Sequence, residues 1–419
     1  MHYFTYKNSE LFAEGVPVRD IVNRAGTPLY IYSHKTITRH LDAYMDAFNS
    51  HPNTICYAVK ANPNPALLRI IAKKGGGADV ISGGELFLAL KAGIPAKKIV
   101  YAGVGKTREE IIFALRSGIL MFNVESQDEL VAIDHIAGEL GVKAPIALRV
   151  NPDISVSTHP YISTGLKKHK FGIPIEKALE NYRLANSLPN IRILGIHKHI
   201  GSQITRVSPF VAALKKVLSL AQMLRSQGIK IQYMDIGGGL GIPYNNDENP
   251  PHPKELALKI LPLLRKNNLK LITEPGRSIT GNAGILVTKV LYLKKHHKKE
   301  FVIVDAGMND LLRPSLYDAF HNIQHVKRNR RTKISADIVG PVCESGDFFA
   351  KDRKINRPLQ GDLLAIMSAG AYGFSMSSTY NSRPRVAEVL VKGKKFHIIR
   401  EREQYKDLVR GIKIPEFLK

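Results

Sequence analysis

The sequence predicts a (β/α)8 barrel over residues 27–278 and a second, mostly antiparallel β domain, a barrel or sandwich, formed by residues 279–419 together with residues 1–26. Two observations lead to this fold class. Short β-rich runs alternate with helix-like stretches about eight times between residues 54 and 276, which is typical of a parallel sheet closed into a barrel. After residue 278 the runs remain β-rich, but the long helical patterns disappear.

Eight segments of the first region have the composition of barrel strands. In chain order they are TICYAVKA (54–61), GADVIS (77–82), IVYAG (99–103), MFNVES (121–126), IALRVNP (146–152), ILGIHKHIG (193–201), YMDIGGG (233–239) and LITEPG (271–276). Segments between them, such as GGELFLALKAG, place apolar residues at helical spacing and end on Gly, a usual helix stop. An open doubly wound sheet is the alternative, but its G-x-G-x-x-G fingerprint is absent after the first strand.

The region after residue 278 indicates strands joined by turns. Its β-rich runs are GILVTKVLYLKK, EFVIVDAG, KISADIVG, DLLAIMSAGAYG and RVAEVLVKGKKFHIIRE. Residues 1–26 precede the first barrel unit, and chain termini often lie close together. We therefore expect these N-terminal residues to join the β domain.

The 419 residues contain only two cysteines, which is too few for a disulfide framework and favours a reducing compartment. The N-terminal residues lack the basic and then apolar pattern of a signal peptide, and no apolar run approaches the ~20 residues of a membrane helix. These features predict a cytoplasmic protein that does not bind membranes.

The net charge of +25 is concentrated in part in two clusters, KKHHKK (294–299) and KRNRRTK (327–333). Neither cluster is interleaved with aromatic residues or set in a recognisable nucleic-acid-binding module. We therefore expect solvated loops or hairpin ends, and no specific nucleic-acid partner.

Active sites of such barrels form at the carboxyl ends of the strands. The predicted strands end near a lysine, a histidine, a glycine-rich turn, carboxylates and arginines, namely Lys60, Asp79, Arg149, His199, Gly237–Gly239, Glu274, Gly276 and Arg277. Each alone is weak evidence. Together they indicate a site with an amine, an aromatic base, a carboxylate and an anion cradle.

The glycine-rich turn DIGGGLG (235–241) predicts a phosphate site, because successive glycines let backbone N–H groups approach an anion closely. TEPGR (273–277) adds the Gly276 N–H and an arginine. Ser202, which follows His199 in HKHIGSQ (197–203), can hydrogen-bond a phosphate, and the imidazole can stack on a planar cofactor. Ordinary loop punctuation and a core histidine are the alternatives.

Lys60 is a candidate Schiff-base lysine, because an amine held in a partly desolvated barrel mouth can attack an aldehyde. A neighbouring phosphate cradle then suggests pyridoxal 5'-phosphate. Glu274 would face the pyridine nitrogen and keep the ring protonated, so that the ring accepts electrons from a breaking bond. By itself, Lys60 is equally well explained as a surface lysine at a strand end.

The second region adds polar residues suited to an amino-acid substrate. Arg313 and Tyr317 offer a fork of donors and a phenol for a carboxylate. Cys343 could hand over a proton, and the adjacent Glu344 could hold an ammonium group. Without such a role, Cys343 is a small buried hydrophobe. Tyr372 lies in a flexible turn between Ala371 and Gly373.

Eight motifs, in this order along the chain, resemble those of the diaminopimelate decarboxylases, within the alanine-racemase-like (fold-type III) class of pyridoxal-phosphate enzymes. They are YAVKAN, GADVISGGE, HIGSQ, GGGLG, TEPGR, DAGMNDLLRP, CESGD and GAYG. DAGMNDLLRPSLYDAFH (305–321) is the most specific, since it separates this family from ornithine and arginine decarboxylases of the same fold.

The resemblance implies a role for each matching residue. Lys60 carries the cofactor as a Schiff base, His199 stacks on the ring, Glu274 faces its nitrogen and Cys343 is the proton donor. Tyr372 contacts both cofactor and substrate. The remaining implied cofactor contacts are Asp79, Ser202, Gly238, Gly239, Pro275, Gly276 and Arg277, and the implied substrate contacts are Arg277, Arg313, Tyr317 and Glu344. No metal is implied.

The resemblance further implies decarboxylation of meso-2,6-diaminopimelate at its D-centre to L-lysine and carbon dioxide, by a homodimer in which Cys343 comes from the partner subunit. Decarboxylases of ornithine, arginine or carboxynorspermidine are the nearest alternatives. An amino-acid racemase would use a tyrosine as its proton donor, and a non-catalytic pyridoxal-phosphate-binding protein would not need the complete set of site residues.

Overall fold

The computed structural model describes residues 2–154, 170–245 and 247–418, and the chain divides into two compact units. We call Ile37–Ile279 the barrel unit, and Met1–Thr36 with Thr280–Lys419 the β unit. The sequence placed the boundaries after residues 26 and 278. In the structure, the N-terminal part of the β unit ends ten residues later than predicted, at Thr36. The reason is β4 (Leu29–Ser33), which was not among the predicted strands. This strand pairs with β14 (Gly284–His296) and β20 (Ala387–Lys392) of the β unit.

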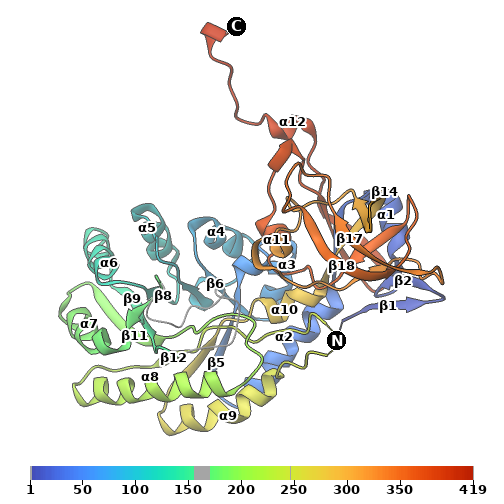
Figure 1. The fold of residues 1–419 in the computed structure, drawn as a ribbon. Coiled ribbons are helices and arrows are strands. Elements are labelled where there is room, and N and C mark those ends of the chain that lie inside the picture. Colours follow the sequence, from blue (N-terminus) through green and yellow to red (C-terminus); the bar gives the residue numbers. More distant parts are fainter. Residues whose placement is uncertain (1, 155–169, 246, 419) are drawn as a thin grey trace. The chain divides into compact units, whose positions relative to one another are not determined.

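The barrel unit is built on eight parallel strands, as the sequence predicted (Figure 1). They are β5 (Asn53–Ala58), β6 (Gly77–Val80), β7 (Ile99–Tyr101), β8 (Met121–Val124), β9 (Ala144–Asn151), β11 (Ile191–His197), β12 (Tyr233–Asp235) and β13 (Lys270–Thr273). Pairing of β13 with β5 and of β8 with β9 closes the barrel. The two-residue β10 (Ile173–Pro174) lies beside β9.

Helices cover the outside of the barrel (Figure 1). They are α2 (His34–Phe48), α3 (Pro65–Lys73), α4 (Gly83–Lys91), α5 (Arg108–Ser117), α6 (Gln127–Glu139), α7 (Ile175–Ser187), α8 (Ser208–Ser226) and α9 (Pro253–Lys266), with the short α10 (Arg277–Thr280) after β13. Side-chain N-caps stabilise the first turns of several of these helices. Thr107 and Glu110 form a capping box at α5, and Ser82 accepts the Glu85 N–H at α4.

The β unit contains a mixed sheet in the order β18-β17-β15-β14-β4-β20-β21. The strands not yet given are β15 (Lys299–Val304), β16 (Ile323–His325), β17 (Lys333–Val339), β18 (Phe348–Asn356), β19 (Leu363–Ile366) and β21 (Lys395–Arg400). The N-terminal residues form β1 (Phe4–Lys7), β2 (Glu10–Ala13) and β3 (Val16–Pro17), followed by α1 (Val18–Ala25). Pairing is antiparallel except for β15 with β17 and β20 with β4.

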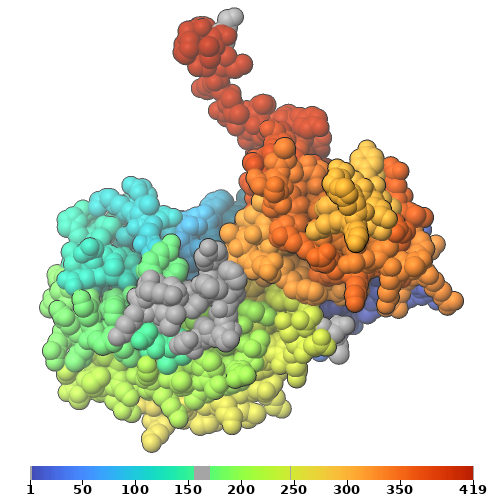
Figure 2. Space-filling view, in the orientation of Figure 1, coloured from blue at the N-terminus to red at the C-terminus, as the bar shows by residue number. Residues whose placement is uncertain are grey.

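The C-terminal segment beyond β21 includes the short helices α12 (Tyr405–Leu408) and η7 (Glu416–Leu418). Its large apolar side chains other than Leu408 are exposed, and Figure 2 shows the segment extending away from the rest of the β unit. Within the described parts of the chain, no helix is long and apolar enough to cross a bilayer.

Candidate active site

Lys60 lies in a one-turn 3-10 helix, η1 (Val59–Ala61), and not in the strand that the sequence predicted through residue 61. The strand β5 ends at Ala58. The Lys60 amine donates a 2.8 Å hydrogen bond to Asp79 Oδ2, and 34% of the Lys60 side chain is exposed, whereas Asp79 is buried in β6. Burial raises the pKa of Asp79 to about 6, and the charge of Glu274 adds to the rise while Lys60 opposes it. A partly exposed amine therefore stands beside a buried carboxyl group.

The glycine-rich turn after β12 lies against the turn after β13. The Glu274 N–H donates to the carbonyl of Gly237, and the Ala58 N–H donates to the carbonyl of Pro275. A Cβ atom at Gly238 would lie 2.1 Å from the backbone oxygen of Glu274, so only glycine allows this close approach. These contacts join the carboxyl ends of β12, β13 and β5.

Arg277 and Ser202 are brought together beside these turns. The guanidinium of Arg277 donates to Ser202 Oγ over 3.0 Å and to the Tyr244 hydroxyl over 2.6 Å. Arg277 is 6% exposed. A buried guanidinium, a hydroxyl and glycine backbone make a site suited to an anion such as a phosphate. Tyr244 was not predicted, because it lies in a loop with no signal in the sequence.

His199 lies two residues beyond the end of β11 and is partly buried. Its Nδ1 accepts a 3.2 Å hydrogen bond from the Gly238 N–H. Burial, with the cations Arg149 and Lys60 next in effect, holds the pKa of His199 well below its usual value. The ring is therefore neutral, which agrees with its acceptor role and suits stacking on a planar group.

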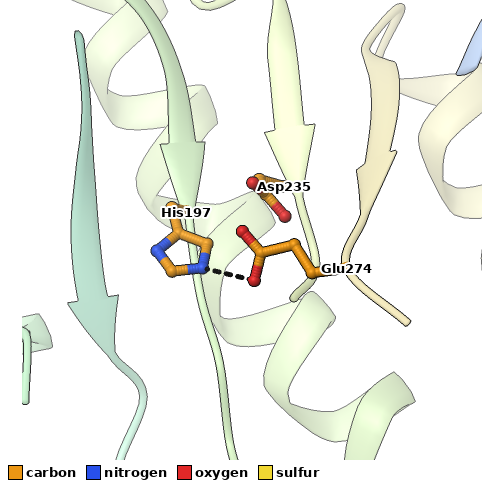
Figure 3. Close-up of side chains that lie close together, drawn as sticks. All are labelled: His197, Asp235 and Glu274. Atoms are coloured by element: carbon orange, nitrogen blue, oxygen red, sulfur yellow. Dashed lines mark ion pairs between the residues drawn. The ribbon is translucent and has the colours of Figure 1, made fainter. Parts of the chain in front are cut away.

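Glu274 sits in a buried polar network (Figure 3). Its Oε1 accepts a 3.2 Å hydrogen bond from Asn123 Nδ2, and its Oε2 lies 3.4 Å from His197 Nε2. The same amide of Asn123 donates to Asp235 Oδ2 over 3.2 Å. His197, Asp235 and Glu274 each offer a ligand atom within 4.8 Å of the others.

The two carboxyl groups of this network, Glu274 and Asp235, differ in protonation state. Burial acts to raise the pKa of Glu274, but the charge of His197, together with that of Lys60, outweighs it and holds that pKa well below the usual range. Burial and the neighbouring Glu274 raise the pKa of Asp235 well above its usual value. Glu274 is therefore the ionised member of the pair, and Asp235 holds a proton.

Sequence reasoning did not single out Asn123, His197 or Asp235. Each is a polar residue within a run that otherwise reads as a buried strand, and that is the signal that could have found them. His197 also precedes His199 by two positions, the spacing that repeats one face of a strand.

The other five predicted site residues belong to the β unit. Arg313 begins the short helix α11 (Arg313–Tyr317) and is 5% exposed. Its Nη1 donates over 2.9 Å to His321 Nε2, while His321 Nδ1 donates to the carbonyl of Met367 over 2.8 Å. Tyr317, at the other end of α11, is partly buried.

Cys343 and Glu344 lie in the turn between β17 and β18, and both are exposed, so Cys343 is not a core residue. The buried Asp347 holds this turn by accepting the Val342 and Met308 N–H groups, each over 2.6 Å. The Cys343 N–H donates to Asn381 Oδ1 over 2.8 Å.

Tyr372 has a φ of +57° and lies before a crowded glycine. A Cβ atom at Gly373 would lie 2.4 Å from the Ala369 carbonyl oxygen. The tight turn therefore depends on Gly373, and it fixes the backbone from which the partly buried Tyr372 side chain projects.

Comparison with known proteins identifies the family of this chain. The family model described as the pyridoxal-binding domain of pyridoxal-dependent decarboxylases matches residues 34–281. A diaminopimelate decarboxylase of Aquifex aeolicus is 54% identical over 97% of this chain and 96% of the relative, and one of Vibrio cholerae is 51% identical over 97% and 98%. The chain belongs to the diaminopimelate decarboxylase family.

Solved structures of this family have the same fold. A diaminopimelate decarboxylase of Helicobacter pylori complexed with L-lysine has a TM-score of 0.91 at 44% identity, covering 94% of this chain and 98% of that one. One from M. jannaschii, also with L-lysine, has a TM-score of 0.94 at 41% identity over 99% of each chain.

The residues of the barrel unit fit the cofactor of the diaminopimelate decarboxylase family, pyridoxal phosphate. The glycine turn after β12 packs directly on the turn after β13, because a Cβ atom at Gly238 would lie only 2.1 Å from the backbone oxygen of Glu274. Arg277 and Ser202 supply donors for a phosphate, Lys60 an amine for the aldehyde, and Glu274 a carboxylate for the ring nitrogen. All four stand at the carboxyl ends of the strands.

Proposed function

We propose that this chain is a pyridoxal-phosphate-dependent decarboxylase that converts meso-2,6-diaminopimelate to L-lysine and carbon dioxide, the last step of lysine biosynthesis. The observation that carries this proposal is a barrel mouth with an amine, an anion cradle and an ionised carboxylate, in a chain 49–54% identical to diaminopimelate decarboxylases over nearly its whole length. When bound, the cofactor supplies an electron sink for the bond broken at the substrate α-carbon.

Lys60 is the residue that attaches the cofactor covalently. Asp79 accepts a hydrogen bond from its amine and so orients it, and because that carboxyl has a pKa of about 6, it can take or release a proton near neutral pH. Asp79 would therefore accept and return the proton of the Lys60 amine, the group that would hold the cofactor aldehyde.

The phosphate is held by Gly238, Gly239, Ser202 and the turn from Pro275 to Arg277. The glycines keep this turn free of side chains, and the Arg277 guanidinium and the Ser202 hydroxyl supply donors. His199, held neutral and fixed by the Gly238 N–H, packs its ring on the cofactor. Glu274 accepts the ring N–H.

Residues of the β unit select and protonate the substrate. Arg277, Arg313 and Tyr317 bind substrate carboxylates. Tyr372 contacts both the substrate and the cofactor, and Glu344 binds the distal ammonium group. The exposed Cys343 thiol delivers the proton to the α-carbon from which carbon dioxide leaves. A site that pairs both charges at the distal end rejects a substrate without them, because buried donors left unpaired are costly.

We infer that the enzyme is a cytoplasmic homodimer in which Cys343 enters the site of the partner subunit. Support for this assembly comes from the motif resemblance, in particular from the CESGD segment that carries Cys343.

Replacing Lys60 tests the proposal. Lys60→Ala protein should lose the cofactor that borohydride reduction fixes covalently in the parent, and should lose decarboxylation by several orders of magnitude, because no other amine takes its place. Lys143→Ala, at an exposed lysine, is the matched control. Mass spectrometry of reduced protein and carbon dioxide release provide the readouts.

A substrate panel completes this test. Purified parent protein should release carbon dioxide and L-lysine from meso-diaminopimelate, and little from ornithine, arginine or carboxynorspermidine. Equal turnover of ornithine would refute the assigned substrate, and cofactor binding without carbon dioxide release from any member would identify a non-catalytic binding protein.

A further inference from the structure

Two buried titratable residues of the barrel, His197 and Asp235, have no role in the function proposed above. His197 is the last residue of β11 and Asp235 the last residue of β12, and the two are directly paired in register. Their exposures are 1% and 0%. Charged or polar groups so deeply buried are costly unless they serve a contact.

Both side chains lie beside the Glu274 carboxylate, and the ion pair joins it to His197 (Figure 3). His197 Nε2 is 3.4 Å from Glu274 Oε2, and neither of the ring nitrogens has a hydrogen-bond partner among the described residues. The imidazole therefore faces the carboxylate as its main polar neighbour. The charge of His197 at this distance lowers the pKa of Glu274.

Asp235 has a different set of contacts. Its Oδ1 accepts the Gly237 N–H over 2.9 Å, and its Oδ2 accepts from Asn123, whose amide also donates to Glu274. Two carboxyl groups this close in a dry site do not both ionise. Because the histidine faces Glu274, the charge settles on Glu274 and the proton on Asp235.

We propose that His197 and Asp235 are positioning residues that keep Glu274 ionised and fixed in place as the acceptor for the cofactor's ring N–H. This inference rests on the proposed function. His197 supplies the opposing charge, Asp235 holds the proton that would otherwise neutralise Glu274, and Asn123 joins the two carboxyl groups. A neutral Glu274 could not favour a protonated ring nitrogen, and the electron sink would weaken.

The test compares single and double variants of the full-length holoenzyme. His197→Gln and His197→Phe should each lower kcat and raise the Kd for pyridoxal phosphate by about tenfold, while KM for the substrate stays within about twofold. The pH at which the cofactor's visible absorbance changes should shift downward, because the ring nitrogen would deprotonate more easily. His51→Gln is the control, because His51 is buried but bonds to the Leu269 carbonyl, away from Glu274.

Two substitutions of Asp235 distinguish a positioning role from a packing role. Asp235→Asn keeps a neutral hydrogen-bonding side chain and should retain activity and cofactor affinity within about threefold, whereas Asp235→Leu should lose both by about tenfold. In a Glu274→Gln background, where no charge remains to be held, His197→Gln should have no additional effect on the Kd for pyridoxal phosphate.

Three results would overturn the inference: unchanged absorbance and cofactor Kd in both His197 variants, an undiminished effect in the Glu274→Gln background, or a stoichiometric metal ion bound by His197, Asp235 and Glu274. If a variant fails to fold by circular dichroism, the other variant at that position and the Asp235→Asn comparison decide. Failure of the proposed function is separate, because the parent protein would then not decarboxylate meso-diaminopimelate.

Discussion

Lys198 stands between the two site histidines, yet its side chain is fully buried and its Nζ has no hydrogen-bond partner in the described parts of the chain. The amine lies 5.8 Å from the ring centre of Phe210. Burial lowers the pKa of Lys198 to about 7, with Asp235 acting in the opposite direction. A lysine in this position lowers stability at neutral pH and adds no contact to the proposed chemistry.

Replacing this lysine should therefore stabilise the protein. From about pH 10.5 down to about pH 7 the unfolded chain binds a proton that the folded chain does not, so parent stability falls as pH falls through this window. Lys198→Met has no such loss. Its free energy of unfolding should exceed that of the parent by roughly 2–4 kcal/mol at pH 7, and by much less at pH 10.

Thermal and urea unfolding at the two pH values would measure this difference. Lys215→Met, at an exposed position on α8, is the matched control and should change stability little at either pH. A gain that is the same at pH 7 and pH 10 would show that the amine is not titrating in the folded protein.

At the scale of elements, the turn after β12 has a strict requirement for glycine. A methyl group at Gly238 would meet the Glu274 backbone oxygen at 2.1 Å, so Gly238→Ala should push the two turns apart. We expect roughly a tenfold or greater rise in the Kd for pyridoxal phosphate, equivalent to about 1.4 kcal/mol or more.

Titration of the apoenzyme with pyridoxal phosphate, followed by absorbance, would measure this Kd. Gly105→Ala is the control, because nothing lies within 4 Å of the methyl group it adds. Equal affinity in Gly238→Ala and the parent would mean that this turn does not form the phosphate cradle.

The sequence predicted the eight barrel strands because each is a short apolar run bounded by turn residues, a pattern that depends on local burial alone. It extended β5 to residue 61, because TICYAVKA is uniformly suited to a strand and nothing local shows that pairing stops at Ala58. β4 was missed for the opposite reason, since LYIYS (29–33) is isolated from the alternating pattern and is a strand only because β14 and β20 flank it.

The sequence predicted the site residues that stand in recognisable motifs. It missed the residues that become neighbours only through the register of the strands. Lys60, the glycine turn and Glu274 stand out in the sequence as residues at strand ends. His197, Asp235 and Asn123 become neighbours only because β11, β12, β13 and β8 turn the same face inward, and that alignment depends on pairing across the closed barrel.

At the scale of the whole molecule, the basic clusters prove to be surface features of the β unit. KKHHKK ends the hairpin of β14 and β15, with its side chains largely exposed. In the second cluster, Arg331 bonds to Asp362, and Arg328 packs over the Tyr6 ring. Two arginines of the second cluster therefore make contacts within the fold. The net charge of +25 still keeps the surface strongly positive.

The proposed homodimer makes a prediction that needs both halves of the chain. If Lys60 of one subunit works with Cys343 of the other, a hybrid of a Lys60→Ala chain and a Cys343→Ala chain has one site with both residues intact and one with neither. The purified hybrid should recover about half of the parent activity, although each variant alone is nearly inactive.

The reciprocal hybrid decides the matter. A chain that carries both substitutions, paired with a parent chain, leaves each site with one residue missing, and this hybrid should be nearly inactive. If both residues of a site instead came from the same subunit, the outcomes would be exchanged: the first hybrid would be inactive and the second would retain about half of the activity. Co-expression with two affinity tags isolates each hybrid, and carbon dioxide release from meso-diaminopimelate measures it.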